Sequence, residues 1–590
     1  MIILIMYIYK MPISINPGDL YKLSVNIKTN SQINKNIIYS TFSFHMRPMK
    51  VEKTYNEYVV FTNYMEYYKY QPNIVSLQFN AGMFELQNTL LLENINDHFS
   101  LDNNNIFYFT TEHPIENEKI IVKYHNSPNA FLINILIIYI IFCIIIFDIK
   151  KIFSDNITNI DIFLFTSIII FLYFSLQQGD IITTIKNSFS YLNGHIIDFY
   201  SYNLNNVIIS NYYPSTYIVF AIWNIPLKIF SSVVNDYTIN NYVIWYNKLL
   251  PVLAYIFSFV YIYKISRLIG LSKLQSKIIM FMGLTTPIAI YSQFFHAQYD
   301  SFTLLFMTIS YYYYLNNNNN KFILYFAIAL TFKYNCIFYF IVLLILKEKN
   351  ILKITKSFLF GISLIILETI MYIWDKDFIK SVLQFSANSF ILSSNIEIAE
   401  IFGIKLFLFS WIILIFYIYF STKKEYNMNE LFIKSIFYCS CVSFLLFGLA
   451  QWHPNWLILS VPFLVFSHSI SKNRAMFIFL DIVLMLFFII FFINRWPASL
   501  NSYMLQLGIF NDILTPLKSG ILMSELLPDP TLTSYTCISA ILFLNVLFKS
   551  KKYIYENIYD FNKLEVTLIR LRLILGVLMF VIPAILVTSL

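Results

Sequence analysis

The stretch FLINILIIYIIFCIIIFD, residues 131–148, decides the fold of this protein. Its only charged residue is the last one, and an apolar run of this length is typical of a helix that crosses the hydrocarbon core of a membrane. Similar runs recur near 160–178, 243–264, 278–294, 299–315, 355–374, 403–420, 432–450, 454–470, 475–493, 534–548 and 569–589. The sequence therefore predicts a polytopic α-helical membrane protein.

The composition supports this prediction. The chain is 58% hydrophobic and only 13% charged, whereas about a quarter of the residues of a typical soluble protein are charged. The net charge of +8 does not indicate nucleic acid, because Lys and Arg lie in short loops between the apolar runs. The cysteines fall in predicted spans without metal-site spacing, so we expect no disulfides and no structural zinc. They are Cys143, Cys336, Cys439, Cys441 and Cys537.

Residues 1–128 differ from the rest of the chain. Short β-rich runs such as Tyr21–Ile27 and Ile120–Tyr124 alternate with turns rich in Asn, Pro and Gly. This period-two alternation predicts an N-terminal all-β sandwich, followed by a transmembrane domain over 129–590. A carbohydrate-binding jelly roll and a structural or docking module both fit such a domain.

Two later segments depart from simple spans. Lys333 and Asn335 interrupt 322–347, which predicts two half-length helices that meet at a polar point and line a cavity. Tyr213–Phe230 contains two prolines, and we interpret it as a helix along the membrane surface. With these assignments the chain has about 12–14 transmembrane helices.

The distribution of Lys and Arg orients the chain. These residues concentrate in alternate loops such as 264–277, 347–356 and 549–563, and the opposite loops carry few. The positive-inside rule therefore predicts a multi-pass integral membrane protein with both termini and the β domain on the extracytoplasmic side. In a prokaryote the membrane would be the plasma or inner membrane; the sequence does not reveal the organism, so this side is the periplasm, the cell exterior or the ER lumen. Met1–Tyr9 is too short for a signal peptide, so we expect an upstream anchor or unaided crossing.

Three polar clusters lie at the outer ends of predicted helices, where charged residues point to function. The first holds Gln177–Asp180, His195, Asp198 and Asn211–Pro214; the second holds Gln293–Ser301 and Phe332–Tyr334; the third is Gln451–Trp456. We expect the three clusters to converge on one site.

These motifs resemble the GT-C superfamily of membrane glycosyltransferases, over about 160–470. A carboxylate after an early span precedes an Asn-Tyr-Tyr-Pro segment, Asn211–Pro214. His296–Ser301 is similar to a Gly-Gln-x-Asp-Ser type motif, and Ala329–Lys333 to an Ala-x-x-x-Lys segment. His296 and Ser215 depart from the usual residues of the family. The likeness implies a mannosyltransferase-like enzyme that transfers a sugar from a polyprenyl-phosphate donor to a glycan, lipid or protein acceptor.

The chemistry of such a transfer assigns roles to the polar residues. The acceptor hydroxyl needs a base, for which Asp180 is the first candidate and Asp198 the second. Lys333, with His296 or His453, would hold the charge of the phosphate leaving group. No cofactor is expected, although Asp180 and Asp198 sharing a metal stays an alternative. The predicted substrate-binding residues are His195, Tyr213, His296, Gln298, Asp300, Lys333, Gln451, Trp452 and His453.

Other interpretations stay open. Asp300 in a first helical turn is typical of a helix cap, and Lys333 of a side chain that reaches the membrane surface. A flippase or polymerase for lipid-linked glycans shares the same lipid and compartment. A secondary transporter would show internal repeats, and we find none in the sequence.

Overall fold

The computed structural model describes nine strands between Leu20 and Tyr124, scattered positions between 157 and 173, and most of the chain after 178. The later described ranges are 179–206, 208–230, 241–295, 299–385, 392, 394–399, 402–422, 425–495, 530–550 and 560–575. The strands and the helices belong to two separate compact units. The predicted span 131–148 and most of 569–589 lie outside the described residues.

The N-terminal unit is built from strands that pair mainly in antiparallel fashion. Strand β1 (Leu20–Lys28) pairs along its whole length with β5 (Tyr58–Glu66), and β5 also pairs with β4 (Lys50–Thr54). Strand β7 (His98–Leu101) pairs with β8 (Phe107–Thr110) and touches β1 in parallel at one position. The short strands β2 (Phe42–Phe44), β3 (Arg47–Pro48) and β6 (Gln78–Phe79) form a second sheet, and β9 (Lys123–Tyr124) joins β1. The sandwich packing of the two sheets remains a prediction.

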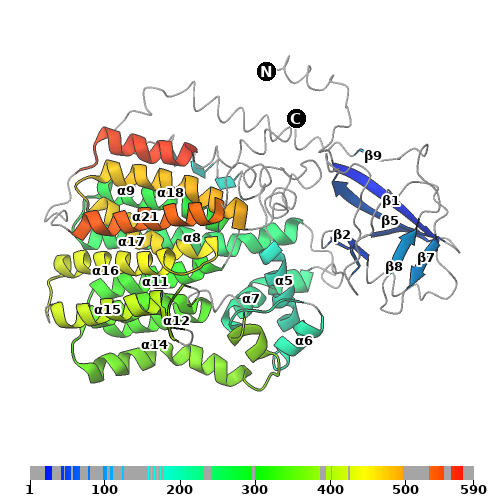
Figure 1. The fold of residues 1–590 in the computed structure, drawn as a ribbon, viewed down its shortest axis with the longest axis horizontal. Coiled ribbons are helices and arrows are strands. Elements are labelled where there is room, and N and C mark those ends of the chain that lie inside the picture. The colour runs from blue at the N-terminus through cyan, green and yellow to red at the C-terminus, as the bar shows by residue number, and fades with distance from the viewer. Residues whose placement is uncertain are drawn as a thin grey trace, which may run out of the picture. The chain divides into compact units, whose positions relative to one another are not determined.

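The second unit is a bundle of helices (Figure 1). Three of its described helices are long and apolar enough to cross a membrane: Val243–Leu268 within α8 (Asn241–Leu268), α14 (Ile351–Tyr372) and α16 (Met428–Gly448). Also described after α8 are the helices α9 (Lys273–Leu284), α10 (Pro287–Ile290), α11 (Asp300–Leu315), α12 (Asn319–Phe332), α13 (Ile337–Lys347), α15 (Leu406–Ser421), α17 (Val461–Ser469), α18 (Arg474–Arg495), α21 (Pro530–Ser550) and 563–575.

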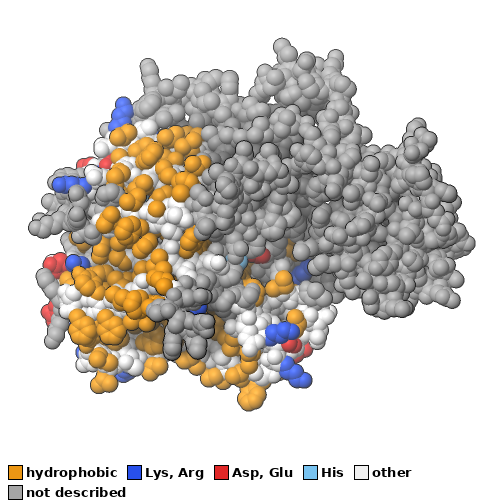
Figure 2. Space-filling model, viewed as in Figure 1, with side chains coloured by type: hydrophobic (Ala, Val, Ile, Leu, Met, Phe, Trp, Pro, Cys, Tyr) orange, Lys and Arg blue, Asp and Glu red, His pale blue; other side chains and the backbone are white. Residues whose placement is uncertain are grey.

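The surface of this unit agrees with a membrane environment. Figure 2 shows hydrophobic side chains spread over the visible face of the described helices. Helix α14 exposes apolar side chains along its length, among them Leu359, Phe360, Ile366 and Ile370. Exposed apolar patches of this extent are uncommon on soluble monomers. The described bundle is therefore that of a helical, membrane-type protein, and the number of crossings and their direction remain predictions.

The predicted interruption at Lys333 is confirmed. Helix α12 ends at Phe332, Lys333 has extended backbone angles (φ −150°, ψ 107°), and α13 follows after one short turn. The predicted span 278–294 is also interrupted, which the sequence analysis missed. Helix α9 ends at Leu284, because Pro287 lacks an N–H and disfavours helical geometry at the residue before it.

Three further helices form the region that precedes the long spans. They are α5 (Gly179–Leu192), α6 (Phe199–Asn205) and α7 (Pro214–Phe230). Helix α7 begins at Pro214, as expected for a proline at a first helical position. The loop between α6 and α7 is held by Asn187 of α5. The Asn187 side chain donates to the Ile209 carbonyl (2.8 Å) and accepts from the Ser210 hydroxyl. These bonds fix the loop that carries Tyr212.

Candidate functional site

The centre of the candidate site is a buried ion pair between Asp300 and Lys333. Lys333 Nζ lies 3.2 Å from Asp300 Oδ1, and the two residues are 4% and 1% exposed. Asn455 donates from Nδ2 to the other carboxylate oxygen at 2.6 Å. Asp300 opens α11, Lys333 occupies the break after α12, and Asn455 lies in the 3-10 turn Pro454–Ser460. Three segments far apart in sequence therefore meet at one charged point.

Aromatic rings enclose the ammonium group of Lys333. Lys333 Nζ is 4.7 Å from the ring centroid of Trp456 and 5.1 Å from that of Tyr212. Tyr212 in turn packs edge-on against Tyr299 at 4.4 Å. Cations attract the faces of aromatic rings, most of all where water is excluded. The cage therefore surrounds a buried lysine that is paired with one carboxylate.

Asp180 acts on the same group of residues from the first turn of α5. Burial, followed by the negative charges of Asp300 and Asp180, raises the pKa of the Tyr212 phenol well above its ordinary value. The charge of Asp180 also attracts Lys333. The structure thus brings Asp180 of the first predicted cluster into the same electrostatic neighbourhood as Asp300 and Lys333 of the second.

His195 and Asp198 form a separate pair at the surface. Nδ1 of His195 lies 3.2 Å from an Asp198 oxygen, and its ring stacks on Tyr202 at 3.5 Å. The Asp198 side chain is 60% exposed. Within the described residues, no contact joins this pair to the Asp300–Lys333 pair, so Asp180 is the better placed of the two predicted bases.

The remaining predicted site residues have different surroundings. Tyr213 is half-buried against Phe378, with ring centroids 6.1 Å apart. Gln451 is exposed, and His453 packs edge-on to Trp456 at 5.3 Å. Trp452 is buried in the protein core, where its indole N–H donates to the Phe447 carbonyl at 2.7 Å. His296 and Gln298 lie outside the described residues.

Sequence reasoning missed Asn455, Tyr212 and Tyr299 as members of the site. Asn455 and Trp456, instead of Gln451 and Trp452, are the members of the third cluster that reach the ion pair. The sequence could have pointed to these residues, because all of them lie inside the three polar clusters described above. In the part of the chain that the structure describes, no three His, Cys, Asp or Glu side chains are arranged to hold a metal ion.

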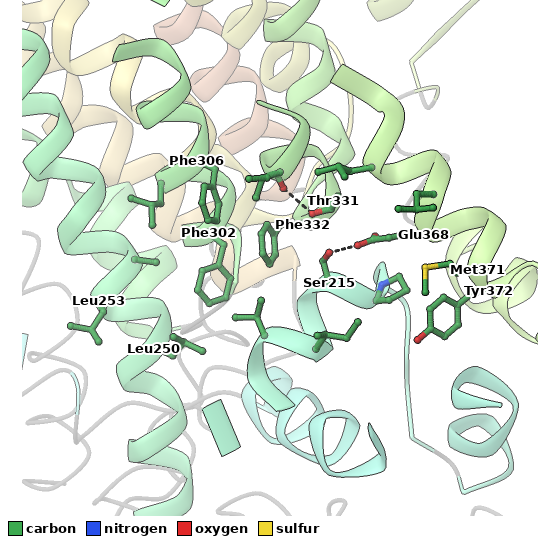
Figure 3. Close-up of a pocket in the computed structure, with 18 of the residues that line it drawn as sticks. Ser215, Leu250, Leu253, Phe302, Phe306, Thr331, Phe332, Glu368, Met371 and Tyr372 are labelled. Carbon is green, nitrogen blue, oxygen red and sulfur yellow. Dashed lines mark hydrogen bonds between the residues drawn. The ribbon is translucent and has the colours of Figure 1, made fainter. Parts of the chain in front are cut away.

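An apolar groove of about 660 Å³ lies between helices of the bundle (Figure 3). Phe302 and Phe332, which line it, follow Asp300 by two positions and precede Lys333 by one. Its walls come from five helices, α7, α8, α11, α12 and α14. Polar side chains in these walls are few: Ser215, Thr331, Glu368 and Tyr372. Its largely apolar lining suits a hydrocarbon chain.

The Asn455 contact gives a first prediction. Replacing Asn455 with Leu leaves one oxygen of the buried Asp300 carboxylate without its hydrogen bond. We expect the free energy of unfolding to fall by about 1–3 kcal/mol and any activity of the site to fall at least about tenfold. Trp452→Phe, which keeps the apolar ring in the core, is the matched control and leaves activity within about threefold. Equal activity in Asn455→Leu and wild type would contradict the assignment.

Comparisons with protein-family models, with curated proteins and with solved structures found no match.

Proposed function

We propose that this protein is a membrane glycosyltransferase that moves a sugar from a polyprenyl-phosphate donor to an acceptor hydroxyl at the outer or lumenal membrane face. The observation that carries the proposal is the buried Asp300–Lys333 pair in its aromatic cage, with Asp180 in the same electrostatic neighbourhood. A phosphate-linked donor needs a cation for its phosphate, and an acceptor hydroxyl needs a base.

The chemistry divides between the carboxylate and the lysine. Asp180 accepts the proton of the acceptor hydroxyl as its oxygen attacks the anomeric carbon. The bond from that carbon to the phosphate oxygen breaks, and its electron pair leaves with polyprenyl phosphate. Lys333 holds the charge that develops on that phosphate, where low dielectric makes the attraction strong. Asp300, itself held by Asn455, fixes the lysine between the rings of Tyr212 and Trp456.

The test separates the two predicted bases. Polyprenyl-phosphate sugars are incubated with the purified full chain and a panel of acceptors, and released polyprenyl phosphate is measured. Asp180→Asn should reduce turnover at least about a hundredfold, as expected for loss of a general base. Asp198→Asn, on an exposed side chain, should stay within about threefold.

Two results would overturn the proposal. One is the absence of polyprenyl phosphate release from every donor. The other is uptake of a solute into proteoliposomes that depends on an ion gradient and is lost in Asp180→Asn, which would assign the site to a transporter.

A further inference from the structure

The apolar groove contains one ionisable carboxylate. Glu368 lies on α14 and faces the groove together with Ser215 of α7 and Thr331 of α12 (Figure 3). Among the described residues that line the groove, Glu368 is the only charged one, and no Lys, Arg or His accompanies it. A carboxylate in such a setting is costly, because burial removes its water without supplying a positive partner.

The partners of Glu368 account for only one of its oxygens. The hydroxyl of Ser215 donates to Oε1. Oε2 is buried and has no hydrogen-bond partner within the described structure. The Thr331 hydroxyl cannot serve it as it stands, since that hydroxyl already donates to the Ile328 carbonyl at 2.8 Å. The groove wall therefore holds one carboxylate oxygen that no donor in the described structure uses.

The groove extends away from this acceptor between apolar helices. On α8 its lining runs from Leu250 to Phe257, which corresponds to about 10 Å of helix axis. The side chains along that length are Leu253, Ala254 and Phe257, faced by Phe306 and Ile328. A single hydrocarbon chain fits these walls, and its polar end would lie near Glu368 and Ser215.

We propose that this groove binds a lipid alcohol whose hydroxyl donates to Glu368. The lining selects this occupant, because it offers a hydroxyl an unused hydrogen-bond acceptor, whereas the phosphate head of a lipid would find no Lys, Arg or His among the described lining residues.

A structural alternative is that Glu368 only holds the start of α7 through Ser215. The two roles predict different behaviour of two variants. Glu368→Gln keeps an oxygen acceptor for Ser215 but loses the charge, so a purely structural role leaves lipid binding unchanged. Glu368→Leu removes both. Ser363→Ala, on the exposed part of the same helix and outside the groove lining, is the matched control.

The experiment measures binding of four single-chain amphiphiles to the full chain in nanodiscs, by displacement of a photoactivatable alcohol of the same chain length. The four carry a hydroxyl, a methyl ether, an amine or a phosphate head. We expect the alcohol to bind at least about tenfold more tightly than its methyl ether, which cannot donate a hydrogen bond. Glu368→Gln and Glu368→Leu should reduce that preference to about twofold or less, while Ser363→Ala keeps it.

Three other outcomes would overturn the inference. Tighter binding of the phosphate ester than of the alcohol would assign the groove to the donor lipid. Strong binding of the amine, with no preference for the alcohol over its ether, would show that no hydroxyl donates to Glu368. An unchanged preference in Glu368→Gln would leave Glu368 with its structural role alone. Failure of sugar transfer from all donors, with the preference intact, would refute the proposed function and not the lipid site.

Discussion

Lys333→Met is expected to reduce the proposed sugar transfer about a thousandfold, the largest effect on activity among our predictions. Removing one preorganised group that stabilises developing negative charge costs about a hundred- to a thousandfold, and here the group carries a full charge in a buried position. Lys333 is 4% exposed and is held between Asp300, Tyr212 and Trp456. The measurement is polyprenyl phosphate release per mole of folded protein.

The same change also leaves Asp300 buried without its cation, which by itself destabilises a protein by about 3–5 kcal/mol. A double variant separates the two effects. Asp300→Asn combined with Lys333→Met removes both charges, so we expect stability to return close to wild type while activity stays low. A purely structural ion pair predicts the opposite for activity, namely that it recovers with stability. Lys333→Arg keeps the charge, but its larger planar group fits the aromatic cage poorly and should recover only part of the rate.

Arg572→Met is expected to lower the free energy of unfolding by about 3–5 kcal/mol, the largest effect on stability. Arg572 is fully buried in the helix 563–575 and donates to Asp481 of α18 at 2.6 Å and to Thr285 at 3.1 Å. It also donates to the Met282 carbonyl, next to the interruption after α9. The Arg572 side chain therefore donates both to a backbone carbonyl near the end of α9 and to the buried carboxylate of Asp481.

The measurement is thermal or denaturant unfolding of the purified chain in detergent, with Leu564→Ala on the exposed side of the same helix as control. Leu564→Ala should change stability by no more than about 1 kcal/mol. Adding Asp481→Asn to Arg572→Met should restore part of the loss, because it removes the unpaired charge, although the hydrogen bond of His468 to this side chain, 2.9 Å long in the wild type, then loses its charged acceptor. A loss in Arg572→Met no larger than in Leu564→Ala would show that the network contributes little.

Two features of the site followed from local sequence rules. A lysine and an asparagine inside an apolar run predicted the break between α12 and α13, because an interrupted helix can place a charge in a protein-lined position. The Pro in Asn211–Pro214 predicted where α7 begins. Both depend on residues within one turn of each other, which is the range over which backbone geometry is set by neighbours.

Which members of a motif face the site was not predictable in the same way. In the cluster Gln451–Trp456, Trp452 packs in the core and Asn455 and Trp456 reach the ion pair. The segment is partly a 3-10 turn, so the helical period of 3.6 residues does not tell which side chains share a face. Similarly, the alternation in 1–128 predicted strands but did not reveal the parallel contact between β1 and β7.

By itself, the sequence determined that this is a chain of apolar helices with interruptions at polar residues, because length and hydropathy of a run suffice to specify a helix suited to a membrane. Only the tertiary structure decided the pairings: Asp300 with Lys333, Arg572 with Asp481, and Glu368 with Ser215. The partners are separated by 33, 91 and 153 positions. Contacts at such separations depend on how whole helices pack, and packing is a property of many side chains together.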